Sequence, residues 1–81
     1  MVPEDPRLHF VLIEIDLAIT FAQISLTAYG SGHDEHGNSA KANAIKAMES
    51  ARHFMKYLGA YGQQLALAEL SRLEEALKVL D

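Results

Sequence analysis

The chain of 81 residues contains no cysteine. This absence excludes disulfide bridges, thiolate zinc sites and cysteine nucleophiles, and it is consistent with a reducing compartment. Proline is also scarce, because both prolines precede residue 7. A helix is therefore permitted along the rest of the chain.

Basic residues are fewer than acidic ones. Seven lysines and arginines stand against eleven aspartates and glutamates, and the formal net charge is −4. Affinity for a nucleic-acid backbone comes chiefly from lysine and arginine, which are scattered here, so we expect no nucleic-acid partner. The N-terminus MVPEDPR lacks the basic leader and apolar run of a signal peptide. We therefore expect a cytoplasmic protein.

Strand signals are absent as well. Hydrophobic residues make up 49% of the chain and charged residues 22%, which is a globular balance. The β-branched residues follow a helical and not an alternating period, and a chain of this length builds one domain. The sequence therefore predicts a single all-α domain over residues 1–81.

Three helices are predicted. Asp5 followed by Pro6 is a helix start, and a helix over about 6–29 follows. The stretch GSGHDEHGN, residues 30–38, predicts a loop. Asn38 or Ser39 would cap the second helix, over about 39–58.

Gly59 stands where a left-handed C-terminal cap would end the second helix. A leucine ladder then predicts a third helix over about 63–80. Connections this short join antiparallel neighbours, so the sequence predicts a three-helix, up-down-up antiparallel bundle.

The first helix is apolar on two sides, whereas the other two each have one apolar face. Its first arc, expected in the core, comprises Leu8, Val11, Leu12, Ile15, Ile19, Ala22, Leu26 and Tyr29. Its second arc comprises Phe10, Ile13, Leu17, Phe21 and Ile24, with Ala28 beside them. Narrow polar stripes separate the two arcs, and Ser25 lies on one of them.

A three-helix bundle covers only one broad arc of a helix, so the second arc would face water in a monomer. Burying its five large side chains on each of two chains would contribute on the order of 10 kcal/mol before association entropy is subtracted, at about 25 cal/mol per Å² of apolar area. We therefore expect a twofold homodimer packed through the first helix.

Two alternatives to the dimer remain open. The second helix is rich in alanine, so its neighbours could approach closely and wrap the first helix within one chain. A different protein could also cover the second arc. A membrane span is disfavoured, because Glu14 and Asp16 lie inside the apolar segment. Each acid would cost roughly 2.5 to 3.5 kcal/mol at the centre of a bilayer, so we expect no membrane partner.

The expected loop contains a dense group of potential metal ligands, His33, Asp34, Glu35 and His36. Imidazoles and carboxylates bind transition metals, which makes His33, Asp34 and His36 candidate ligands. A glycine-flanked loop would not hold them in place, however. The alternative is a solvated loop whose acids favour the start of the next helix. We expect no metal and no cofactor.

The segment HFMKYLGAYGQQLALAEL, residues 53–70, resembles the histidine phosphotransfer domains. In that family an exposed histidine is followed three residues later by lysine and, after a glycine, by another helix. His53 and Lys56 carry the resemblance, which implies phosphate acceptance at His53. The chain departs from the family at Tyr57, where the family has glycine, and in lacking a fourth helix. The alternative is a surface histidine one turn after Glu49.

Nothing in the sequence assembles a catalytic constellation. Ser25, Ser50 and Ser71 have no histidine and acid at matching helical offsets. Glu69 is expected to pair with Arg72. We therefore expect a protein that is not an enzyme, namely a small helical interaction or scaffold protein that self-associates. The alternative is a signalling or ligand-binding module, with phosphotransfer at His53 or metal binding between His33 and His36.

Overall fold

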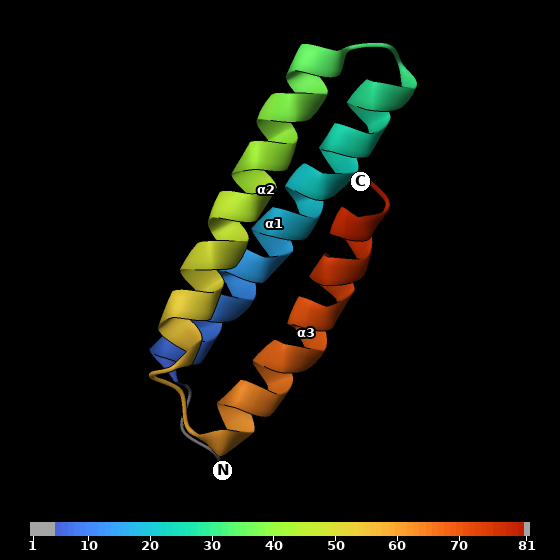
Figure 1. Cartoon of the computed structure of the whole chain (residues 1–81). Helices are drawn as coiled ribbons and strands as arrows, with labels where there is room; N and C mark the ends of the chain where they lie inside the picture. The colour runs from blue at the N-terminus through green and yellow to red at the C-terminus, as the bar shows by residue number, and fades with distance from the viewer. Residues whose placement is uncertain (1–4, 81) are drawn as a thin grey trace.

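The computed structural model describes residues 5–80, which form three α-helices: α1 (Pro6–Gly30), α2 (Asp34–Met55) and α3 (Ala60–Lys78). Helices α1 and α2 lie side by side as an antiparallel hairpin, and α3 turns back to run in the direction of α1 (Figure 1). No strand occurs in this part of the chain. The predicted all-α class, with three packed helices in up-down-up order, is confirmed.

Helix α1 begins where the sequence indicates. The Asp5 side chain accepts a hydrogen bond from the Arg7 backbone N–H at 2.9 Å, and Pro6 occupies the first helical position. At the other end the backbone N–H of His33 donates to the Ala28 carbonyl oxygen at 2.8 Å. Gly32 has a φ of 80°, a left-handed conformation that a residue with a side chain rarely adopts. This glycine allows the chain to reverse in three residues.

The predicted loop over residues 30–38 is wrong for most of its length, because α2 begins at Asp34 and not at 39. Asp34 and Glu35 stand in the first turn, where acidic side chains favour a helix N-terminus. Gly37 is buried against the ring of Tyr29, and a Cβ on it would lie 2.7 Å from two ring carbons. This tertiary contact outweighs the low helix propensity of glycine.

The second connection also differs from the prediction. Helix α2 ends at Met55 and α3 begins at Ala60, each about three residues earlier than expected. Gly59 has φ −69° and ψ 172°, so it is the extended residue that precedes α3 and not a left-handed cap. The Gln63 side-chain amide closes the turn by donating to the Leu58 carbonyl oxygen at 3.0 Å.

The hydrophobic core lies where all three helices meet. It comprises Val11, Ile15, Ala18, Ala47, Ala51, Met55, Leu58, Ala66, Leu70 and Leu73. This cluster, with the partly buried Ile19 beside it, reaches only part of the way along α1, because α3 is shorter and stops before the C-terminal end of α1 (Figure 1). Past that point the hairpin is packed through small buried residues such as Ala22 and Ala44.

Several residues lie elsewhere than their helical positions predicted. Ala28, which stands beside the second arc, is buried at 5% exposure. Leu26 is 48% exposed because α3 ends before reaching it. Phe54, which lies within the single apolar face predicted for the second helix, is 40% exposed at the edge of α2. Ser25, expected on a polar stripe, is fully buried, and its hydroxyl donates to the Gly37 carbonyl oxygen at 2.7 Å. The hydrogen bond explains how a hydroxyl is accommodated between the two helices.

Candidate functional site

One side of α1 is apolar and uncovered. Exposed fractions are 37% for Phe10, 51% for Ile13, 43% for Leu17 and 38% for Ile24, and Phe21 is half-buried. We call these five residues the apolar face. They are the residues of the second arc that the sequence placed at an interface. Neither α2 nor α3 covers them fully.

The packing of α1 explains why this face is open. Helix α3 approaches α1 at Leu8, close to Gly62. By helical geometry Leu8 points away from Leu17, at a separation of nine residues. Helix α2 takes the side between them, where Ala18 and Ala22 are buried. Two neighbours therefore occupy the first arc and leave most of the apolar face uncovered.

The apolar face extends onto α2 through aromatic contacts. The rings of Phe10 and Phe54 meet edge to face, with centroids 5.0 Å apart and an angle of 82° between their planes. Tyr57 continues the row, its ring centroid 6.4 Å from that of Phe54. Such edge-to-face pairs are favourable beyond the area they bury. The sequence missed this extension because Phe54 fits the apolar arc of its own helix.

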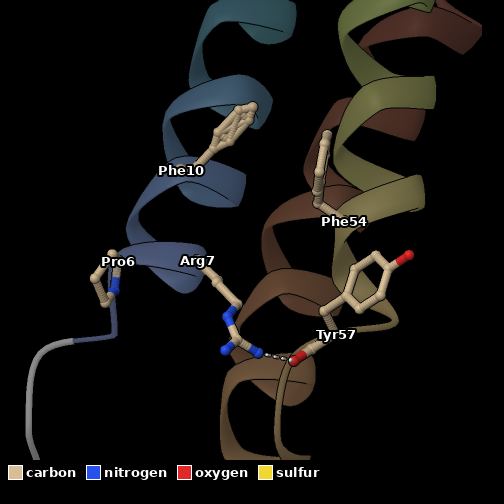
Figure 2. A pocket seen from close by; sticks show the side chains of 5 residues that line it. All are labelled: Pro6, Arg7, Phe10, Phe54 and Tyr57. Atoms are coloured by element: carbon tan, nitrogen blue, oxygen red, sulfur yellow. Dashed lines mark hydrogen bonds between the residues drawn. The ribbon is translucent and has the colours of Figure 1, made fainter.

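A pocket of about 480 Å³ lies at this end of the face, which we call the aromatic pocket. Figure 2 shows Pro6, Arg7 and Phe10 on the α1 side of it, opposite Phe54 and Tyr57. The Arg7 guanidinium donates from Nη1 to the Tyr57 carbonyl oxygen at 3.3 Å, which links the start of α1 to the turn after α2. The sequence indicated Pro6 and Arg7 only as part of a helix start.

A shallow depression of about 330 Å³ lies at the opposite end of the hairpin, which we call the histidine end. Its lining consists of Thr20, Gln23, Ile24, Thr27, Ala28, Ser31, His33 and His36. Asp34 is not part of it, because Asp34 and His36 are two positions apart on the helix and their side chains point to different sides. Within residues 5–80 no three histidine or acidic side chains gather to hold a metal ion. The three candidate ligands are therefore not brought together.

His53 is exposed on α2 and packs edge-on against its neighbours. Its ring centroid lies 4.9 Å from that of Phe54 and 6.0 Å from that of Tyr57. The Lys56 ammonium lies 5.9 Å from the centroid of the Tyr57 ring. The bulky Tyr57, 54% exposed, therefore lies beside the histidine, where the phosphotransfer family has a glycine.

Several charged residues pair on the surface. Glu69 accepts from Arg72 at 3.2 Å, as the sequence predicted. Arg52 and Glu74 form an ion pair at 2.9 Å between α2 and α3. Glu69 and Glu74 are therefore surface carboxylates that each pair with an arginine. Neither needs a reactive site to explain it.

By length and composition, α1 would be able to cross a membrane, a property that core helices of soluble proteins share. Comparison with known protein families, curated proteins and solved structures gives no match to this chain. The apolar face and the two different ends of the hairpin are therefore the features of the chain that bear on its function.

Proposed function

We propose that this chain is a small helical interaction module that self-associates through the apolar face of α1 and has no chemistry of its own. The observation that carries the proposal is the exposure of large apolar side chains in one row, with Ile13 and Leu17 the most open. A row of this kind on a soluble domain marks an interaction site.

The size of the face supports a second copy as the occupant. Helix α1 has 25 residues and the molecule is 19 Å across, so at about 1.5 Å per residue the α1–α2 side measures on the order of 700 Å². A stable protein interface buries about 800 Å² on each partner. Two copies facing each other would therefore come close to the area that a stable dimer needs if they cover the whole α1–α2 side, with the apolar face at its centre and polar residues at its edges.

A lipid surface fits the same side less well. Glu14 is half-buried at its edge, and Asp16 is exposed on the same helix. At the middle of a membrane each carboxylate costs roughly 2.5 to 3.5 kcal/mol. At a protein interface the same groups can stay at the rim and keep their water.

The test is the solution mass by light scattering behind a sizing column. The wild type should have twice the monomer mass of 8.9 kDa. Leu17→Glu places a charge on the apolar face and should give monomers. Leu26→Glu is the matched control, because Leu26 lies on the same helix, is 48% exposed against 43% for Leu17, and points the opposite way. It should remain a dimer.

Circular dichroism on the same samples reports whether each variant is folded. If Leu17→Glu unfolds, Ile13→Lys provides the same test at a residue that is 51% exposed. A wild type that is folded and monomeric at all concentrations would contradict self-association. Equal dissociation of the Leu17 and Leu26 variants would contradict the assignment of the face.

A further inference from the structure

We infer that the two copies pack antiparallel, with each α1 crossing its copy at Leu17 and each aromatic pocket covered by the histidine end of the partner. This inference rests on the proposed self-association and adds the direction and register of the pair. Three features of the chain support it: the spacing of the apolar face permits this register, and the shapes of its two ends and the dipoles of α1 favour this direction.

The spacing of the apolar face is symmetric about Leu17. Ile13 and Phe21 are each four residues from it, and Phe10 and Ile24 are each seven. In an antiparallel pair that crosses at Leu17, Phe10 of one copy therefore meets Ile24 of the other. Ile13 likewise meets Phe21. Every large side chain of the row finds an apolar partner, so the spacing permits this register. A parallel pair would also match apolar residues, and the two ends of the face therefore decide the direction.

The two ends of the face differ in shape. At one end Phe10, Phe54 and Tyr57 project around the aromatic pocket. At the other, the helices pack through small residues such as Ala28 and Ala40, and the surface is a shallow depression. An antiparallel pair sets the bulky end of each copy against the small-residue end of the other. A parallel pair would bring the two sets of rings together and leave the two depressions facing each other.

The helix dipoles favour the same direction. An antiparallel pair places the positive N-terminal end of each α1 beside the negative C-terminal end of the other, which is the favourable arrangement of two helix dipoles.

The absence of cysteine from the sequence makes a clean cross-linking test possible. Three variants are prepared, each with one cysteine: Leu17→Cys, Phe10→Cys and Ile24→Cys. Under mild oxidation Leu17→Cys should form a covalent dimer by itself. Phe10→Cys and Ile24→Cys should each stay uncross-linked alone and form a heterodimer when mixed, because an antiparallel pair places residue 10 opposite residue 24.

A second measurement leaves the apolar face and the histidine end unchanged. A spin label on Gly30→Cys, exposed at the end of α1 where an added side chain meets nothing within 4 Å, reports the distance between copies by dipolar electron paramagnetic resonance. Residue 30 is thirteen residues from Leu17, so an antiparallel pair should separate the two labels by roughly 40 Å. A parallel pair would hold them within about 25 Å, since two helix diameters are about 20 Å.

The outcomes separate the two proposals. Self-cross-linking of Phe10→Cys and of Ile24→Cys, together with a short label distance, would overturn the antiparallel register while leaving the dimer intact. A reduced wild type that elutes as a monomer would overturn the self-association itself. Cross-linking only in the mixture, with the long label distance, would establish the proposed register.

Discussion

Gly37 shows how a single missing side chain positions two helices. Its Cα faces the ring of Tyr29, and the Tyr29 hydroxyl donates to the Asn38 side-chain oxygen in the same turn. The buried Ser25 hydroxyl bonds to the Gly37 carbonyl oxygen. Glycine is a poor helix former, so its presence in the first turns of α2 is explained by this close approach and not by propensity.

Gly37→Ala should therefore destabilise the fold by about 1–2 kcal/mol, although alanine is the better helix former by about 1 kcal/mol. The added Cβ would lie 2.7 Å from the Tyr29 ring, which must move and give up its bond to Asn38. Thermal unfolding by circular dichroism measures the change. The matched control is Gly30→Ala, where a Cβ meets nothing within 4 Å, and its stability should be unchanged or slightly raised.

At the residue scale, the sequence predicted those features that depend on local chemistry or on periodicity alone. The Asp5 cap and the open second arc at Leu17 are of this kind. The burial of Ser25 and the pairing of Gly37 with Tyr29 could not be predicted. Each depends on which residues of α1 and α2 lie opposite each other when the two helices pack. The aromatic pocket was missed for the same reason.

Helix α3 is attached to the hairpin mainly by apolar packing. Leu73 is fully buried and Leu70 is 5% exposed, both within the core cluster. The ion pair between Arg52 and Glu74 also joins α3 to α2, but the two side chains are 51% and 47% exposed. Solvent and salt screen such a pair, so it contributes little.

Leu73→Ala should lower the free energy of unfolding by about 2–5 kcal/mol, because it leaves a cavity in the core. Glu74→Gln, one residue along the same helix, should change it by less than about 0.5 kcal/mol. Urea unfolding followed by circular dichroism gives both values under one set of conditions. A larger loss for the glutamine variant than for the alanine variant would show that the ion pair, and not the leucines, secures α3.

The existence and order of the helices followed from the pattern of apolar residues and from the glycines between them, whereas their boundaries did not. The stretch from His33 to Asn38 carries polar residues and glycine, which favour a loop locally. Its helical conformation comes from packing on α1. Glycine at position 59 is the residue type that commonly ends a helix. Its backbone is extended, however, and it is the residue that precedes α3.

The described part of the molecule is a rod of 48 × 19 × 17 Å with a thin core, and it carries the apolar face along α1. A chain of 81 residues gains only modest stability from its own core. If self-association covers the apolar face, the folded state and the dimer are linked, and the stability of one depends on the concentration of the other.

The melting temperature of the wild type should therefore rise by about 3–6 °C for each tenfold increase in protein concentration. Leu17→Glu should melt at a temperature independent of concentration, because its folded state is a monomer. Differential scanning calorimetry over two decades of concentration makes the comparison. A wild type without concentration dependence would argue against linkage between folding and assembly.

The short reach of α3 has a consequence for how the molecule opens. Large aliphatic side chains hold the half of the hairpin that α3 covers, whereas alanine and glycine contacts hold the half that ends at Gly32. Local opening costs least where the fewest apolar contacts are lost. In a single copy, the backbone amides around residues 20–30 and 34–46 thus exchange with solvent deuterium through openings that leave the three-helix half intact. A partner lying across that half would slow this exchange.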